Sequence, residues 1–560
     1  MKFNQYAAAA AIASLPATFA SPLQQRQYNS TMVYDFDGIE ATEDLNWTPC
    51  FDEFTCTKLV VPLDYEDEDA GTTYVSFIKW TTNSTLANST AQDILLNPGG
   101  PGGSGIQLLQ GQLKLLIATI GPNHNFVGFD PRGVNNSGPD LSCFPGQEGT
   151  SRFYTDLTIP IDVTNKKSYA EMYQKAAAFG DFCTKAHSAA NDSAKYANTV
   201  AVVNDLRYYT ELLAKSKGQD PTKSQLWSYG ASYGSVLGTT YAALFPDRVG
   251  RVVVDGIVDG EDYYQGKWAN SIEQADEAFR YFFQACYDAG KDGNCTFWDE
   301  SPKAIEERFQ AILEDLADNP IPVAFDIPAI VTISDLKLLM VGVPYNPVDT
   351  FGIFANILTG LEKRNATLLA QAIGIGYRTD ECKIVPDVLP DGEPRQFIAC
   401  NDANHRYNLS TYDAWVEHAN NLVNTSQYLG EAWASGTSVN CRKLAITAPK
   451  SQVFNGYPGA NTTSNPLLFI STAVDPVTPL SAAQKMVKRF GGARLLVQDN
   501  VGHTSTSAVS KCTYGVLQRY FSDKAELPEE GTRCKVDNVP FKDGGVLPPA
   551  RLRKRSLPGY

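Results

Sequence analysis

The stretch QLWSYGASYGSVLGTTYAALFPDRV, from Gln225 to Val249, decides the fold. It opens with a short apolar run typical of a strand, and it closes with apolar residues at helical spacing that end at Pro246. Between the two lies Gly-Ala-Ser-Tyr-Gly, centred on Ser232. So tight a turn forces the serine into strained backbone angles, and it needs a glycine on each side because a Cβ there would collide with the neighbouring element. The sequence therefore predicts a serine presented at the carboxyl end of a sheet strand.

The helix after this turn adds a second feature. Its first backbone N–H, from Tyr233, lies at the positive end of the helix dipole, close to the serine hydroxyl. A G-x-S-x-G pattern also arises by chance in a chain rich in Gly and Ser. The motif is therefore informative only through its strand-and-helix context and through partners elsewhere in the chain.

Composition sets outer limits on function. The chain has 560 residues, is 43% hydrophobic and carries a formal net charge of −15. It is long enough for one large domain with an insertion, or for two domains. The acidic balance argues against nucleic acid or an anionic membrane surface as a partner, because both repel such a protein.

The first 20 residues have the features of a secretory signal peptide. Lys2 supplies the positive start, Ala7 to Leu15 the apolar stretch, and Thr18-Phe19-Ala20 a small-x-small cleavage site. The alternative is an ordinary N-terminal helix. No later apolar run approaches the roughly 18 residues that a membrane span needs, so we expect a secreted, extracellular and soluble mature chain.

Sequons and cysteines agree with export. The chain has 11 cysteines, and the short spacings Cys50 with Cys56, Cys286 with Cys295 and Cys512 with Cys534 favour disulfides, with one thiol left over. The basic tail 551–555 is either solvated or a processing site. We expect N-linked glycans at sequons that include Asn83, Asn88, Asn191, Asn365, Asn408, Asn424 and Asn461.

The strand and helix patterns predict an α/β fold with a mainly parallel sheet and a large helical insertion. Strand patterns cover 58–63, 73–80, 93–96, 125–130, 226–229, 251–255, 466–471 and 493–497. Helical periods dominate 272–287, 302–316, 334–341, 351–361 and 412–433. The predicted divisions are a signal peptide (1–20), an N-terminal arm (21–57), a core (58–260), a helical cap (261–440), the rest of the core (441–525) and a tail (526–560).

A glycine-rich loop, NPGGPGGSG, follows the strand at 93–96. It matches the G-x-G-x-x-G dinucleotide fingerprint, with Asp130 closing the next strand, so a nicotinamide or flavin oxidoreductase is a rival interpretation. Pro98 and Pro101 remove backbone donors that a pyrophosphate would need, and export removes the protein from nicotinamide pools. We favour a second use, in which the Gly100 N–H approaches a developing oxyanion beside Ser232.

Two acidic side chains are assigned structural roles. Asp130 and Arg132 lie two residues apart beside a glycine turn, and we expect a buried ion pair between them. Asp205, on a predicted amphipathic helix, is expected to be structural too.

A serine hydroxyl needs a base and an orienting carboxylate to become a nucleophile. In sheets of this kind the chain order is Ser, then Asp or Glu, then His. Of the five histidines only His503 follows the last strand pattern, and Asp475 follows the strand before it. Ser232 would then attack a carbonyl carbon, with His503 as the base and Asp475 holding its tautomer. The N–H groups of Gly100 and Tyr233 would form the oxyanion hole, and no metal or organic cofactor is implied.

The motifs LLNPGGPGGSG, GFDPRG, YGASYGSVLGTTYAALFP, VVVDGIVD, TAVDPVTP and VGH, in that order, resemble the secreted tripeptidyl and prolyl aminopeptidases of the α/β-hydrolase fold. The resemblance covers about 59–520. It implies release of short peptides or proline from N-termini, a cap over the substrate cleft, and Ser232, Asp475 and His503 as the triad. It also implies a Cys400–Cys441 disulfide.

An aminopeptidase must recognise a free ammonium group, which calls for a carboxylate near the cleft. Asp259 and Asp402 are the candidates, together with Glu261, and the alternative for each is a solvated acid on an acidic protein. The expected partner is a peptide substrate, with no nucleic acid and no membrane. The other functions left open are a secreted carboxylesterase or lipase on the same triad, and a non-catalytic binding protein with a hydrolase fold.

Overall fold

The computed structural model describes residues 32–81, 91–144, 157, 159–376, 392–407 and 409–542. Three groups of sequence predictions lie outside these residues: the signal segment 1–20, the basic cluster 551–555, and the sequons at Asn83, Asn88 and Asn408. Within the described ranges, no helix combines the length and the apolar character that crossing a membrane requires.

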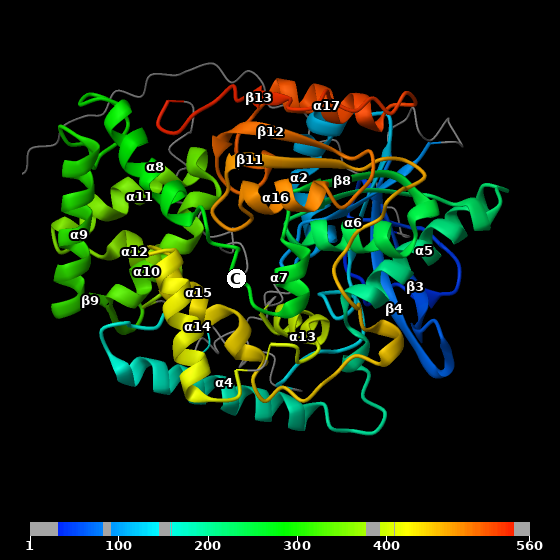
Figure 1. The fold of residues 1–560 in the computed structure, drawn as a ribbon, viewed down its shortest axis with the longest axis horizontal. Coiled ribbons are helices and arrows are strands. Elements are labelled where there is room, and N and C mark those ends of the chain that lie inside the picture. The colour runs from blue at the N-terminus through cyan, green and yellow to red at the C-terminus, as the bar shows by residue number, and fades with distance from the viewer. Residues whose placement is uncertain are drawn as a thin grey trace, which may run out of the picture.

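An 11-stranded sheet forms the centre of one half of the molecule (Figure 1). Its strands are β1 (Ala41–Thr42), β2 (Thr48–Cys50), β3 (Phe54–Asp64), β4 (Asp67–Trp80), β5 (Asp93–Asn97), β6 (Asn125–Asp130), β7 (Leu226–Ala231), β8 (Val249–Asp255), β11 (Leu468–Val474), β12 (Arg494–Val501) and β13 (Arg533–Lys535). They lie in the order β1-β3-β4-β6-β5-β7-β8-β11-β12-β13, with β2 beside β3. From β6 to β13 all neighbours are parallel, whereas β4 pairs antiparallel with β3 and β6. The predicted fold class, α/β with a mainly parallel sheet, is confirmed.

The antiparallel pair β3–β4 contains the predicted strand patterns 58–63 and 73–80, but it also takes in most of the acidic segment between them. Asp64 pairs with Asp67, so the ladder begins at once and residues 67–69 belong to the strand. These acidic side chains are exposed. Charged residues are tolerated in a strand where both faces are in water, and the sequence pattern therefore underestimates its length.

Helices cover both faces of the sheet because its parallel strands alternate apolar residues to either side. On β5, Leu95 belongs to one apolar cluster while Ile94 and Leu96 belong to the other. Apolar side chains of α5 (Thr199–Ser216), α6 (Tyr233–Leu244) and α16 (Leu480–Val487) complete the first cluster. Those of α2 (Gly105–Ile120) and α17 (Lys511–Phe521) complete the second.

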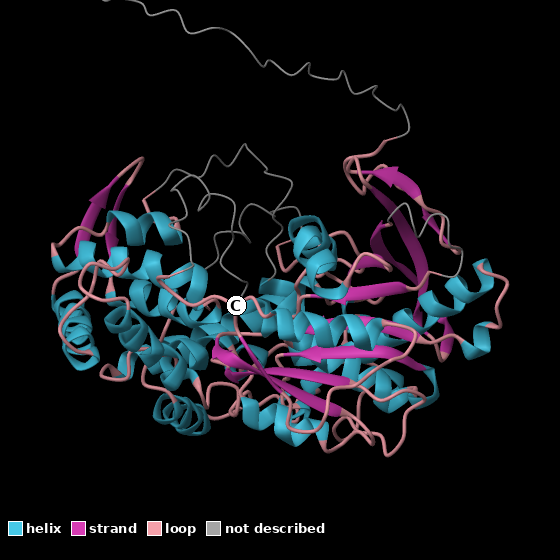
Figure 2. Cartoon of the chain, turned by 90° about the horizontal axis from the view of Figure 1, so that it is seen from above, coloured by secondary structure: helices cyan, strands magenta, loops and turns pink. Residues whose placement is uncertain are grey.

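A helical lobe lies beside the sheet (Figures 1 and 2). It has its own apolar core, in which Phe279, Phe309 and Trp415 are fully buried. It includes α4 (Lys166–Ala186), which precedes the predicted cap in sequence, because the Trp415 indole N–H donates to the Tyr169 carbonyl at 3.1 Å. The cap boundaries 261–440 stay a prediction. The lobe's other elements are α8 (Ala275–Asp288), α9 (Pro302–Asp318), β9 (Ile321–Ala324), β10 (Pro328–Val331), α10 (Ile333–Gly342), α11 (Pro347–Glu362), α12 (Thr367–Ile373), α13 (Gly392–Ala403), α14 (Tyr412–Thr425) and α15 (Gly430–Gly436). The short helix α7 (Gly260–Gln265) instead packs on the sheet, where its Tyr263 and Tyr264 belong to the first cluster.

The predicted single helix over 412–433 is wrong, because α14 ends at Thr425 and α15 begins at Gly430. At the break the buried Ser426 donates its hydroxyl to Asp276 of α8 at 2.6 Å. Gly430 then lies against the end of α14, where an added Cβ would be 2.6 Å from the Leu422 carbonyl oxygen. The sharp corner therefore depends on a tertiary hydrogen bond that helical periodicity does not reveal.

The described cysteines form disulfides that match the predicted pairs Cys50–Cys56, Cys286–Cys295, Cys512–Cys534 and Cys400–Cys441. A further bridge, Cys143–Cys183, joins residues 40 apart in sequence, a separation that gives no signal in the chain. Cys382 lies outside the described residues. Disulfides of this number are typical of proteins from oxidising compartments.

Candidate active site

Ser232 occupies the turn between β7 and α6, as predicted from the opening motif. Its backbone has φ +56° and ψ −123°, outside the ordinary regions for a residue with a side chain. A Cβ on Gly230 would lie 2.3 Å from the Gly234 carbonyl oxygen, and a Cβ on Gly234 would lie 2.9 Å from that of Asn97. The two glycines thus permit the close approach of strand, helix and neighbouring loop that keeps the serine in this conformation.

The glycine-rich loop after β5 packs directly on this turn. A Cβ added to Gly99 would lie 2.6 Å from the Ser232 Cβ and 2.9 Å from the Tyr233 nitrogen. The Asn97 side chain accepts the Gly99 N–H at 2.9 Å and so fixes the start of the loop. Gly100 follows with φ +112°. Among the described residues, neither the Gly100 nor the Tyr233 N–H has a hydrogen-bond acceptor.

Asp475 and His503 follow adjacent strands, β11 and β12, and are in contact. The His503 Nδ1 is 3.0 Å from both carboxylate oxygens of Asp475, which is fully buried. The N–H groups of Val477, Thr478 and Thr504 also donate to this carboxylate, at 2.8–3.1 Å. The carboxylate is thereby held in one orientation, and it orients the imidazole ring in turn.

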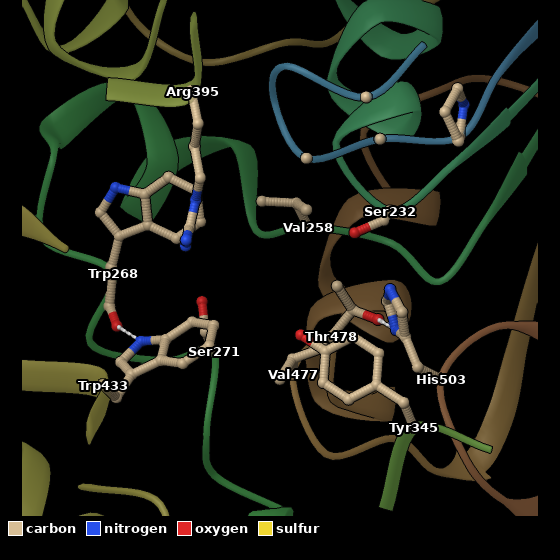
Figure 3. A pocket seen from close by; sticks show the side chains of 14 residues that line it. Ser232, Val258, Trp268, Ser271, Tyr345, Arg395, Trp433, Val477, Thr478 and His503 are labelled. Carbon is tan, nitrogen blue, oxygen red and sulfur yellow. Dashed lines mark hydrogen bonds between the residues drawn. The ribbon is translucent and has the colours of Figure 1, made fainter. Parts of the chain in front are cut away.

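Ser232 and His503 line the same cavity, of about 220 Å³. Figure 3 shows both side chains at one side of it, with a ring nitrogen of His503 directed towards Ser232. Tyr345 packs edge-on against the histidine ring, with centroids 4.9 Å apart, and its carbonyl accepts the His503 backbone N–H at 2.8 Å. The other residues around the cavity are Pro98, Gly99, Gly100, Gly103, Val258, Trp268, Ser271, Arg395, Trp433, Val477 and Thr478.

Asp255, at the end of β8, is a positioning residue that the sequence analysis missed. Its carbonyl oxygen accepts the Ser232 N–H at 2.8 Å, and its carboxylate accepts the Ser505 N–H at 2.9 Å and hydroxyl at 2.5 Å. Burial raises the pKa of this carboxyl, and hydrogen bonds from Ser505 and Tyr229 oppose the rise. A buried acid at the end of the strand next to the serine turn was the available signal.

The structure places neither Asp259 nor Asp402 on the cavity, so neither fits the predicted role of binding a substrate ammonium. Asp259 caps α7, and both its oxygens contact the Lys485 ammonium, at 2.8 and 3.0 Å. The same ammonium contacts Glu261, the third candidate, at 2.8 Å. These acids are paired because the chain supplies its own cation at this point.

Asp402 is buried beneath the cavity wall rather than exposed to a substrate. Its oxygens accept the Thr199 N–H at 2.9 Å, the Thr199 hydroxyl at 2.5 Å and the Tyr263 hydroxyl at 2.6 Å. Burial raises the pKa of Asp402 to about 6. The Thr199 hydroxyl is also hydrogen-bonded to the Tyr233 hydroxyl, at 2.6 Å. Through Thr199, Asp402 therefore links α13 of the helical lobe to α6, the helix after Ser232.

The predicted ion pair between Asp130 and Arg132 is wrong. Arg132 instead binds the Asp205 carboxylate through two of its nitrogens, each at 2.7 Å. Arg132, Asp205 and Asp130 are all buried. Asp130 accepts hydrogen bonds from Ser104 and from Asn136, and burial raises its pKa to about 6. Arg132 lies in a turn that begins at Pro131, directly after Asp130, so the two side chains have different partners although they are close in sequence. The structural role expected for Asp205 is confirmed.

Two family models match the chain. The alpha/beta hydrolase fold model matches residues 94–289, which include Ser232, and the TAP-like protein model matches residues 426–534, which include Asp475 and His503. Together the two matched segments contain the parallel strands β6, β7, β8, β11 and β12 and all three side chains.

Three similar proteins are each 23–24% identical to the chain. Serine protease Hip1 of Mycobacterium tuberculosis is 24% identical over 514 residues, covering 88% of this chain and 91% of Hip1. The tripeptidyl aminopeptidase of Streptomyces lividans is 23% identical over 498 residues, covering 86% and 84%. Carboxylesterase B of M. tuberculosis is 23% identical over 485 residues, covering 86% of each chain. The resemblance to tripeptidyl aminopeptidase-like hydrolases is confirmed, and the chain is a serine hydrolase of the α/β-hydrolase superfamily.

Proposed function

We propose that this hydrolase is a secreted serine aminopeptidase, which releases short peptides or proline from the free N-terminus of peptides through an acyl-enzyme. The observation that supports the proposal most is the shared cavity of Ser232 and His503, with Asp475 directly behind the histidine. The likeness to a tripeptidyl aminopeptidase and to a serine protease supports the peptide substrate.

In the proposed reaction, the Ser232 oxygen attacks the scissile carbonyl carbon while the His503 Nε2 takes the hydroxyl proton. Asp475 is hydrogen-bonded to Nδ1 of His503 and so holds the tautomer in which Nε2 can accept a proton. Its negative charge also stabilises the imidazolium that forms. The C–N bond then breaks, and the imidazolium gives its proton to the departing amine. A water molecule, deprotonated by the same histidine, hydrolyses the acyl-enzyme and restores the serine.

The negative charge on the carbonyl oxygen needs donors that are in place beforehand. The Gly100 and Tyr233 N–H groups are the candidates, because the glycine loop lies against the serine turn and both groups are free of other acceptors among the described residues. Each donor of an oxyanion hole contributes about 10²- to 10³-fold in kcat. The positive end of α6 acts in the same direction.

Secretion and glycosylation are part of the proposal. They are supported by the pattern of residues 1–20, by the disulfides and by sequons at Asn191, Asn365, Asn424 and Asn461, all of them exposed. On expression in a eukaryotic host, the enzyme should be found in the culture medium without its first 20 residues. Treatment with an N-glycosidase should lower its apparent mass. Retention of the enzyme in the cells would contradict secretion.

A carboxylesterase is the second candidate, and one observation favours it. Among the described residues no carboxylate lines the cavity, although a substrate ammonium would require one. Carboxylesterase B is also among the relatives.

A panel of peptide p-nitroanilides with free and blocked N-termini, together with acyl esters, separates the two candidates. The proposal predicts turnover of the free peptides and little turnover of the blocked ones. Equal turnover of both, or turnover of esters alone, would contradict an aminopeptidase.

A further inference from the structure

The cavity beside Ser232 contains a cation that the proposed triad does not use. Arg395, on the first turn of α13, projects into the cavity from the side opposite Ser232 and His503 (Figure 3). Among the described residues around the cavity, Arg395 alone carries a permanent charge. The helical lobe therefore places a positive charge at one end of the cavity, although the protein as a whole has a net charge of −15.

Aromatic side chains surround this positive end. The Arg395 guanidinium carbon lies 6.0 Å from the centre of the Trp268 ring. The Trp433 indole N–H donates to the Trp268 carbonyl at 3.1 Å, and the two indole rings meet edge-on with centroids 6.4 Å apart. Trp433 is buried and Trp268 is partly buried, so the two indole rings give this end of the cavity apolar walls. A charged group between such walls acts more strongly on a bound ion than the same group would in open water.

We propose that Arg395 binds a carboxylate on the substrate and makes a carboxylate at this position a specificity determinant. The inference rests on the proposed function, because it assigns the far end of the same cavity. A planar guanidinium matches a carboxylate through two parallel hydrogen bonds, and apolar walls favour this paired arrangement over a hydrated one.

The carboxylate has two possible sources. It is either an acidic side chain near the scissile bond or the C-terminal carboxylate of a short peptide. A cavity of about 220 Å³ with the serine at one side and the arginine at the other admits only a short span between the two groups. In both cases the reacting carbonyl and the carboxylate belong to the same small fragment of substrate.

The test uses matched substrate pairs. One arm compares tripeptide p-nitroanilides that end in Glu or in Gln, and the other compares tetrapeptides with a free or an amidated C-terminus, with products separated by chromatography. We expect the carboxylate member of one pair to have a kcat/KM higher by about 10-fold or more, the size of a charge-assisted hydrogen-bond pair. The arm that shows the preference identifies the source of the carboxylate.

The variants then assign the preference to Arg395. Arg395→Met should abolish it and Arg395→Lys should retain part of it, with circular dichroism to check folding. Arg280→Met on α8, at a side chain that is 48% exposed and outside the cavity, is the matched control and should keep the preference. Equal turnover within both pairs by the wild type, or an unchanged preference in Arg395→Met, would overturn the inference.

A binding measurement separates this inference from the proposed function. Calorimetry with Ser232→Ala compares the Kd of each peptide pair without any reaction, and tighter binding of the carboxylate member, lost on adding Arg395→Met, is the expected result. If the wild type turns over no peptide or ester, the proposed function fails, while the calorimetric ratio still decides on Arg395. Equal Kd values within both pairs would overturn the carboxylate site.

Discussion

The carboxylate of Asp255 accepts both the N–H and the hydroxyl of Ser505, at 2.9 and 2.5 Å, two residues beyond His503. The carbonyl oxygen of the same aspartate accepts the Ser232 N–H at 2.8 Å. One residue at the end of β8 therefore fixes the turn that holds the serine and the loop that holds the histidine. The spacing between the two side chains depends on it.

We expect Asp255→Asn to lower kcat by about 10- to 100-fold with little change in KM, because misplacing reacting groups by a fraction of an ångström costs rate rather than binding. Steady-state kinetics on a peptide p-nitroanilide measures this split. Asp247→Asn, at a side chain that is 80% exposed, is the control and should match the wild type. A rise in KM with unchanged kcat would show that Asp255 does not position the reacting groups.

Asp475→Asn should lower kcat by about 10⁴-fold, because the amide no longer holds the histidine tautomer that accepts the serine proton. The Asp475 carboxylate also accepts the backbone N–H groups of Val477, Thr478 and Thr504, so the thermal midpoint should be measured on the same sample. Activity within tenfold of the wild type in a folded variant would remove Asp475 from the triad.

Gly99→Ala should abolish activity or folding, since the new methyl group would lie 2.6 Å from both the Ser232 Cβ and the Ala231 carbonyl oxygen. Gly111→Ala is a matched control on α2. Nothing lies within 4 Å of a Cβ at that position, and alanine in a helix is favoured over glycine by about 1 kcal/mol. Thermal denaturation and turnover should therefore separate the two variants. A fully active Gly99→Ala enzyme would contradict the close packing of loop and serine turn.

Burial raises the pKa of Asp402 to about 6 from 3.8, so the folded state binds its proton more tightly than the unfolded state does. Its contribution to stability is therefore complete below pH 3.8 and is lost as the pH rises to about 6. We expect the stability of the wild type relative to Asp402→Asn to fall by about 3 kcal/mol across that window. Denaturant unfolding of both proteins between pH 4 and 7 measures it. A difference that is constant with pH would contradict the assignment.

The sheet and the reacting side chains could be predicted because local pattern determines them. Ser232 lies in a turn whose glycines are required by contact, and Asp475 and His503 each follow a strand with a recognisable apolar run. In a parallel sheet the ends of such strands meet at one edge. Chain order alone is then enough to bring the three residues together.

The substrate side of the cavity could not be predicted in the same way. Arg395 and Trp433 belong to helices, and Trp268 to the loop after α7. Their relative placement depends on tertiary packing, such as the hydrogen bond from Ser426 to Asp276. Asp259 looked like a candidate for binding an ammonium group because Lys485, its partner, is far away in sequence. Long-range partners of this kind leave no periodic signal.

The most direct test of the central claim is the site of covalent labelling by a fluorophosphonate. Such a reagent reacts with a serine hydroxyl only when a base activates it and an oxyanion hole receives the phosphoryl oxygen. Peptide mapping by mass spectrometry should find a single adduct on Ser232, and His503→Ala should not be labelled. An adduct on another residue, or active enzyme with no adduct, would contradict Ser232 as the nucleophile.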